Sequence, residues 1–222
     1  MKIQAFIADW DSKHTRAGVI QQQIHCTTNI PVRILSRRNE PWAYQWEEAV
    51  SRFDGDVMLW IMADTVLRGP DNVLRGSYFP ALIDKMKKVY SAGDVWMYAP
   101  NLDYTSQVYN TKRLKEHSPN VYEVCGTDLV FTSIHRNLLR LLPSVGVNIR
   151  GWGYDYLMTH LANTMDKKVV RDYSFMVDHP FTNCYERTDA DLKMHIWIQS
   201  LPELWRNGIY GQQKMQEELC QP

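Results

Sequence analysis

The sequence predicts an α/β fold in which a mostly parallel central sheet is flanked by helices within a single domain, residues 1–222. The first reason is the uncharged run from Val57 to Ala63, which suits a strand buried on both faces of a parallel sheet. The second is the alternation of strand and helix patterns before and after this run. The third is that no internal repeat, low-complexity tract or linker composition marks a domain boundary.

The expected elements follow in chain order. Strands are expected at residues 3–8, 32–35, 57–63 and 95–99, at 121–131 with an interruption at Gly126, and at 168–171 and 173–177. Helices are expected at residues 15–25, 43–53, 79–89 and 134–142, and a mainly helical tail at 189–216 is expected to cover the sheet. Residues 100–120 are polar with little periodicity, and we expect a long loop there that orders over a substrate.

Composition and charge exclude several classes of protein. Lys plus Arg and Asp plus Glu both number 25, so no net charge draws the chain toward nucleic acid or membranes. The four cysteines form no C-x-x-C pair, which argues against a zinc knuckle and a disulfide framework. Neither a G-x-G-x-x-G turn nor a P-loop occurs. Because signal-peptide and membrane-spanning patterns are absent, we expect a cytoplasmic protein, bacterial or, if viral, in the host cytoplasm.

Three residues are candidates for chemistry. Asp64 follows the central strand, and ligands of open α/β sheets bind beyond the carboxyl ends of strands, although a structural turn also suits this aspartate. Asp155 enters the first turn of a helix after the turn of residues 151–153, and the helix dipole stabilises a carboxylate there whatever its role. His179 ends the last expected strand, a position that suits a structural histidine as well as a ligand.

These residues, in this order, resemble the nucleotide-sugar glycosyltransferases of the GT-A fold, and the resemblance runs from Lys2 to about Pro180. Its most specific part is Gly151-Trp152-Gly153-Tyr154-Asp155, which is similar to the G-W-G-x-(E/D)-D turn of galactosyltransferase-type enzymes. Ala63-Asp64-Thr65 is similar in placement to the D-x-D motif, whose last acid coordinates a divalent metal and the sugar-nucleotide diphosphate. Met62 stands where that motif has its first acid.

The resemblance implies a GT-A-like, Rossmann-like domain. Residues 1–100 would form its nucleotide-sugar-binding half, residues 101–185 its acceptor and catalytic half, and residues 186–222 a C-terminal helical cover. It implies that Asp64 and His179 bind Mn²⁺ or Mg²⁺, and that the stretches 7–11 and 37–39 cradle the nucleoside. The residues expected to contact the donor are Ala8, Asp9, Arg37, Asn39, Ala63, Asp64, Trp152 and Gly153.

The chemistry of sugar transfer needs a set of this kind. The departing nucleoside diphosphate gains negative charge that a divalent ion stabilises, and the acceptor hydroxyl must lose a proton. Asp155 is the candidate base in an inverting mechanism, whereas in a retaining mechanism it would bind sugar hydroxyls. Trp152 is expected either to stack on the donor sugar or acceptor or to fill the core. We therefore predict a hexosyl- or pentosyltransferase that uses a nucleoside-diphosphate sugar, by family habit a UDP-sugar. Its acceptor stays open between a glycan, a small molecule and modified DNA.

Three alternatives stay open from the sequence. A phage-type DNA glycosyltransferase acting on hydroxymethylated bases would use a flipped base and a basic rim. The candidate rim residues are Arg33, Arg37, Arg38, Lys85, Lys87, Lys88, Lys112, Arg113 and Lys115. A metal-dependent hydrolase or nuclease would place Asp64, Asp155 and His179 around an ion. An inactive sugar-nucleotide binder would bind the donor without turnover.

Overall fold

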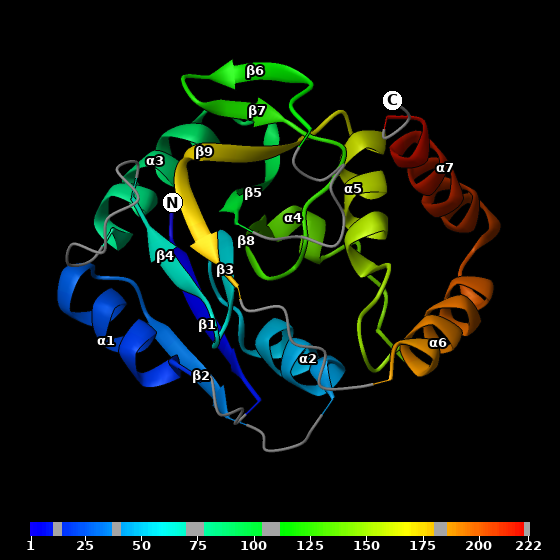
Figure 1. The fold of residues 1–222 in the computed structure, drawn as a ribbon, viewed down its shortest axis with the longest axis horizontal. Coiled ribbons are helices and arrows are strands. Elements are labelled where there is room, and N and C mark those ends of the chain that lie inside the picture. Colours follow the sequence, from blue (N-terminus) through cyan, green and yellow to red (C-terminus); the bar gives the residue numbers. More distant parts are fainter. Residues whose placement is uncertain (11–14, 37–40, 70–77, 104–111, 180–185, 220–222) are drawn as a thin grey trace.

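The computed structural model describes residues 1–10, 15–36, 41–69, 78–103, 112–179 and 186–219. These residues form one nine-stranded sheet in the order β2-β1-β3-β8-β5-β9-β7-β6, and β4 pairs with β9 beside this path (Figure 1). The strands are β1 (Ile3–Asp9), β2 (Val32–Ser36), β3 (Val57–Met62), β4 (Val66–Arg68), β5 (Val95–Leu102), β6 (Lys115–Ser118), β7 (Val121–Glu123), β8 (Phe131–His135) and β9 (Lys168–Asp178).

The long strands of the sheet run mostly in one direction. β1 pairs in parallel with β2 and β3, and β5 pairs in parallel with β9. β8 lies between β3 and β5 and runs antiparallel to both. The predicted α/β fold with a mostly parallel sheet is therefore confirmed, and the carboxyl ends of β1, β3, β5 and β9 point to one edge, where ligands bind in open α/β sheets.

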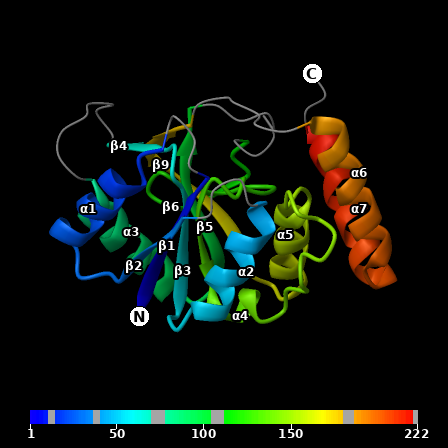
Figure 2. The ribbon, with the colours of Figure 1, turned by 90° about the horizontal axis from the view of Figure 1, so that it is seen from below.

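Helices cover both faces of the sheet (Figure 2). α1 (Ala17–Thr27) and α3 (Phe79–Ser91) pack on one face, and α2 (Trp42–Arg52), α4 (Arg136–Leu139) and α5 (Tyr154–Thr164) pack on the other. α6 (Arg187–Ser200) and α7 (Glu203–Leu219) form a further layer outside α5, and α7 packs against α5. No helix in the described part of the chain is long and apolar enough to cross a membrane.

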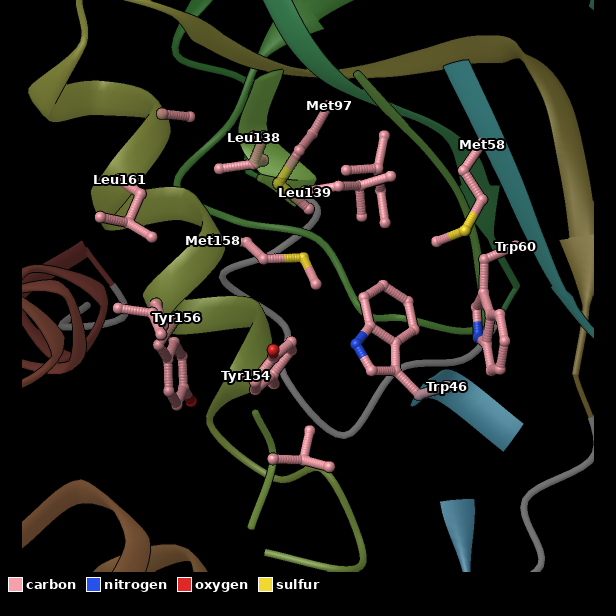
Figure 3. Packing of buried hydrophobic residues seen from close by; sticks show 14 of the residues in the cluster. Trp46, Met58, Trp60, Met97, Leu138, Leu139, Tyr154, Tyr156, Met158 and Leu161 are labelled. Atoms are coloured by element: carbon pink, nitrogen blue, oxygen red, sulfur yellow. The ribbon is translucent and has the colours of Figure 1, made fainter. Parts of the chain in front are cut away.

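An aromatic cluster fixes α5 and α2 against the sheet (Figure 3). The Trp46 ring lies edge-on to Trp60 of β3 and to Tyr154 of α5, with centroid distances of 5.2 and 5.7 Å. Trp42 stacks on Trp46 at 5.1 Å. Aromatic rings favour these arrangements, and each buries a large apolar area. The first turn of α5, which carries Asp155, is therefore held by packing.

Four of the expected elements differ from the structure. Residues 121–131, expected as one interrupted strand, belong to two strands in different places, because β7 pairs with β9 while β8 lies between β3 and β5. The helix expected at 134–142 is the single turn α4, because Phe131–His135 continues as a buried strand. Short apolar runs fit either a strand or a buried helix, so periodicity alone misplaced this boundary.

Residues 168–178, expected as two strands, form the single strand β9. The expected loop 100–120 contains β6, and its residues 104–111 are outside the described ranges.

Candidate active site

The candidate site begins where β1 and β3 end side by side. Ala63 N–H donates a hydrogen bond to the Ala8 carbonyl at 3.0 Å, which extends the parallel pairing beyond the last ladder pair, Ala8 with Met62. The chain then turns, because both the backbone N–H and the hydroxyl of the buried Thr65 donate to the Met62 carbonyl. Asp64 lies in this turn and is thereby fixed at the carboxyl edge of the sheet.

His179 meets Asp64 at this edge although 114 residues separate them in the sequence. The His179 Nε2 atom lies 3.5 Å from Asp64 Oδ1, and both side chains are about one-fifth exposed. β4, which follows the Asp64 turn, pairs antiparallel with the end of β9, and Val66 stands opposite Asp178. The pairing of β4 with β9 therefore brings the two side chains together.

A bend in β9 makes this meeting possible. The register between β5 and β9 jumps between the pairs Pro100 with Asp172 and Asn101 with Met176. The buried Asp172 carboxylate spans the irregular segment, because it accepts hydrogen bonds from the Tyr98 hydroxyl at 2.6 Å and from Ser174 N–H at 2.8 Å. Bulges of this kind bend a strand and redirect the residues beyond them. The irregular segment after Asp172 therefore directs the end of β9 toward β4.

Further charged groups surround His179. Its backbone N–H donates to the Asp103 carboxylate at 3.1 Å, which ties it to the end of β5. The neighbouring Asp178 forms an ion pair with Arg68 of β4. These two contacts hold the backbone of His179 and the residue before it in place. Asp103 and Arg68 were not among the candidate residues of the sequence, because only the pairing of β9 with β4 and β5 brings them to this place.

Asp64 and His179 suit a divalent ion. Asp64 Oδ1 is buried and has no hydrogen-bond partner among the described residues, so a carboxylate oxygen is left to face the imidazole alone. Two ligands that each lie about 2.1 Å from one ion are ~3.0–3.4 Å apart, close to the observed separation. No third acidic, histidine or cysteine donor completes a site within the described ranges, so the two residues leave coordination positions for phosphate oxygens or water. They therefore fit such an ion as partial ligands.

Met62, at the position of the first acid in the D-x-D pattern, has a packing role. Its side chain is partly buried and lies against the core cluster that α2 and α5 form with the sheet. A carboxylate at this position would face apolar groups, and burying a charge there is costly.

Asp155 enters the site from the first turn of α5. Gly153 precedes the helix with φ of 76°, and Gly151 has φ of 74°, values that residues with side chains adopt rarely. A Cβ atom on Gly151 would also lie 2.3 Å from the Trp42 ring, so this close approach requires glycine. Trp152 packs in part against the core, and its carbonyl accepts from the Asn148 amide. The sequence Gly-Trp-Gly therefore orients the start of α5.

Asp155 is electrostatically coupled to a second acid. Burial, reinforced by the negative charge of Asp128, raises the pKa of the Asp155 carboxyl to about 7. Asp128 lies in the segment that leads into β8, and Met62 N–H donates to the carbonyl of Val130 at 2.8 Å. Because β8 is antiparallel to β3, its beginning reaches the edge at which β3 ends. Asp128 therefore lies at the same edge as Asp64, on the side of α5.

A buried arginine lies on the same face. Arg171 of β9 is inaccessible to solvent and donates one hydrogen bond, at 3.3 Å, to the hydroxyl of Thr127. Burial lowers the pKa of its guanidinium, and the charge of Asp128 opposes that effect. The Nε and Nη1 atoms of Arg171 have no hydrogen-bond partner in the described part of the chain. A buried cation next to Asp128 is thus part of the surroundings of Asp155.

Of the two stretches expected to contact the nucleoside, 7–11 and 37–39, the structure describes residues 7–10. Asp9 is buried at the end of β1, where it accepts hydrogen bonds from the Thr15 hydroxyl at 2.7 Å and the Ser36 hydroxyl at 3.3 Å. This joins the ends of β1 and β2. Arg37 and Asn39 lie outside the described residues.

The candidate basic rim does not form one described surface. Arg37 and Arg38 are outside the described ranges. Lys85 donates to the Pro119 carbonyl, and Lys112 donates to the Leu219 carbonyl. Arg33 lies on β2 at one end of the sheet, whereas Lys115 lies on β6 at the other end. Arg33 is thus separated by the width of the sheet from Lys115 and from Lys85, which reaches the β6–β7 turn.

No family model and no curated protein matches the sequence. Solved structures are similar in fold. A197 from STIV is 21% identical with a TM-score of 0.53, covering 82% of this chain and 87% of that chain. TarS from S. aureus, in complex with UDP-GlcNAc, is 9% identical with a TM-score of 0.53, covering 94% of this chain and 70% of that chain. GalNAc-T7 with UDP, GalNAc and Mn²⁺ is 8% identical with a TM-score of 0.53, covering 96% of this chain and 54% of that chain.

At these identities the likeness concerns the fold. It confirms the predicted α/β architecture and supports the expected GT-A-like glycosyltransferase fold. The chain spans about half of GalNAc-T7 (54%) and a larger part of TarS.

Proposed function

We propose that this protein transfers a sugar from a nucleoside-diphosphate sugar, with uridine as the nucleoside, to an acceptor hydroxyl. The observation that carries the proposal is the pair of Asp64 and His179, brought to 3.5 Å at the carboxyl edge of the sheet by two different strands. The complexes of TarS with UDP-GlcNAc and of GalNAc-T7 with UDP and Mn²⁺ support the choice of nucleotide and of metal.

In this proposal Asp64 and His179 hold Mn²⁺ or Mg²⁺ together with the diphosphate of the donor. A bound divalent ion would stabilise the charge that develops on the departing diphosphate. The histidine favours Mn²⁺, because imidazole suits transition metals better than Mg²⁺. Residues 1–100 form the donor half, in which Ala8, Asp9, Ala63 and the 37–39 stretch are proposed to contact the nucleoside.

Asp155 is proposed to be the base that takes the proton of the acceptor hydroxyl. A carboxyl group with a pKa of about 7 is ionised in roughly half of the molecules at neutral pH and binds a proton far more tightly than an ordinary aspartate. Asp128 supplies part of this effect and is proposed as a positioning residue. Trp152 and Gly153 are proposed to contact the donor sugar from the start of α5.

The direct test is binding and turnover of UDP-sugars. We expect UDP to raise the melting temperature in the presence of Mn²⁺ and to have much less effect with a chelator, because a ligand that binds the native state stabilises it. UMP, which lacks the second phosphate, serves as the matched control. The rise in melting temperature that UMP causes should depend less on Mn²⁺. Incubation with a panel of UDP-sugars should then release UDP.

Two results would contradict the proposal. The first is a protein that binds no uridine nucleotide under any metal condition. The second is metal-dependent cleavage of phosphodiesters without any sugar donor, which would indicate a hydrolase or nuclease built on the same residues.

A further inference from the structure

An exposed arginine is stacked on two tyrosines at the opposite end of the sheet from β2. Arg113 lies two residues before the start of β6, and its guanidinium carbon is 4.1 Å from the ring centroid of Tyr173 and 4.9 Å from that of Tyr122. The two rings meet edge to face at 5.6 Å. Arginine favours such stacking on aromatic faces, which orders its planar group.

The backbone fixes the three residues relative to one another. Leu114 N–H donates to the Glu123 carbonyl at 2.9 Å, so the residue that follows Arg113 is held against β7. Tyr173 N–H donates to the Asn120 carbonyl at 2.8 Å, so the bend of β9 is held against the β6–β7 turn. Three separate segments of the chain thus form one site. We call Arg113, Tyr122 and Tyr173 the Arg113 cluster.

The Arg113 cluster lies on the face of the sheet that carries the proposed base. Tyr122 of β7 pairs with Arg171 of β9, and directly opposed residues of antiparallel strands point to the same face. Val169, two residues before Arg171, belongs to the core cluster that includes α5. Arg171 in turn contacts Thr127, next to Asp128, whose charge acts on Asp155. The cluster and the acid pair are therefore joined along one face.

Arg113 has a guanidinium edge available for a ligand. It is exposed, and one of its N–H groups donates a hydrogen bond to the Tyr173 hydroxyl. A guanidinium carries five N–H donors, so others stay available for a ligand. Stacking occupies the faces of the guanidinium, whereas its N–H groups lie in its plane and match the oxygens of a phosphate or carboxylate. An arginine that is ordered before its ligand arrives loses less side-chain entropy on binding.

From these observations we propose that the Arg113 cluster is an acceptor subsite that binds a phosphate or carboxylate carried by the acceptor. The inference rests on the proposed transfer function, because it assigns the anion to the molecule whose hydroxyl reaches Asp155. The diphosphate of the donor is assigned to a different place, the Asp64 edge next to β4. The acceptor is accordingly a hydroxyl compound that carries a phosphate or a carboxylate.

The test is a titration of small anions into the full chain while the donor site is occupied by UDP and Mn²⁺. Glycerol phosphate and gluconate serve as the phosphate and carboxylate probes, followed by nuclear magnetic resonance or calorimetry. We expect at least one probe to bind to the UDP-saturated protein, and its dissociation constant to rise at least about tenfold in Arg113→Ala. The probe that binds in this way identifies the anion of the acceptor.

Matched variants separate stacking from charge. Lys115→Ala removes a cation of the same hairpin that stands opposite Glu123, and we expect it to bind the probe as the unaltered protein does. Arg113→Lys keeps the charge without the planar fork and should bind weakly, whereas Tyr173→Phe keeps the ring and should retain binding. Unchanged melting temperatures show that the hairpin still folds in each variant.

Several outcomes would overturn the subsite. They are binding that survives Arg113→Ala, an equal loss in Lys115→Ala, or complete displacement of the probe by UDP, which would place the anion in the donor site. The same titration without nucleotide separates the two proposals. If UDP does not bind but glycerol phosphate binds through Arg113, the proposed sugar transfer is wrong. The Arg113 cluster would then bind an anion that is not a sugar acceptor.

Discussion

Asp64 and Asp155 are two carboxylates at one edge of the same sheet, yet their nearest titratable neighbours differ: an imidazole for Asp64 and a second acid for Asp155. Asp64 faces an imidazole at 3.5 Å and lies in the tight turn after β3. Asp155 lies at the start of α5, where burial and the charge of Asp128 raise its pKa to about 7. A carboxylate next to an imidazole can bind a metal ion together with that imidazole. A carboxylate next to another acid takes up a proton more readily.

This difference assigns the two acids to different steps. A carboxyl group that takes up a proton near neutral pH is suited to transfer protons, whereas a carboxylate beside an imidazole is suited to bind a cation. Asp64 would act on the donor diphosphate and Asp155 on the acceptor hydroxyl. The division predicts that variants of the two residues fail in different measurements: turnover for Asp155 and metal-dependent nucleotide binding for Asp64.

The largest expected effect is on turnover in Asp155→Asn. An amide of the same shape does not take up the proton, so we expect the rate of transfer to fall about 100- to 10,000-fold while UDP binding changes little. Release of UDP from the sugar donor measures the first quantity, and calorimetry measures the second. In the unaltered protein the rate should rise with pH through about 7, because the base must be ionised.

Asp189→Asn is the matched control for this prediction. Asp189 also lies in the first turn of a helix, α6, and pairs with Lys193 at the surface. We expect its rate to equal that of the unaltered protein. Near-normal turnover in Asp155→Asn would remove the assignment of the base.

A smaller effect is expected on metal-dependent binding in Asp64→Asn. An amide oxygen is a weaker ligand than a carboxylate, so the Mn²⁺-dependent part of UDP affinity should fall at least about tenfold, or about 1.4 kcal/mol. His179→Ala should produce a similar loss, and chelation of the metal should bring all three proteins to the same weak affinity. Calorimetry with and without Mn²⁺ measures these values.

Arg52→Ala provides a control far from the site, because Arg52 pairs with Glu48 on the surface of α2. If Asp64→Asn binds UDP with unchanged dependence on Mn²⁺, the Asp64 and His179 pair has a structural role and the two acids are not divided as proposed.

The N-terminal elements could be predicted because each follows a simple pattern. Val57–Met62 is apolar throughout and forms a central strand, and the residue that follows such a strand must reach the ligand-binding edge. That rule placed Asp64 correctly at this edge. The glycines before Asp155 predicted a tight entry to a helix, and both have positive φ.

The remaining features depend on pairings that no local pattern contains. Asp128 reaches the edge because β8 is antiparallel to its neighbours, and no pattern in residues 121–131 predicted this direction. His179 reaches Asp64 because the bulge after Asp172 redirects β9 onto β4. The Arg113 cluster likewise requires three segments to meet. Such contacts follow from the topology of the complete sheet.

The smallest expected effect is on stability, and it concerns Asp155 alone. In the unfolded chain an aspartate ionises near pH 4, but in the folded protein the Asp155 carboxyl has a pKa of about 7, so the folded state binds the proton more tightly between these values. The stability that this group contributes is fully present below about pH 4 and is lost as pH rises toward 7. We therefore expect Asp155→Asn to have a higher melting temperature than the unaltered protein at pH 8, by several degrees, and a smaller advantage at pH 5. Thermal unfolding of both proteins across this range measures the difference, with Asp189→Asn as the reference. A constant difference at every pH would mean that Asp155 is an ordinary aspartate, and its contrast with Asp64 would then lose its electrostatic basis.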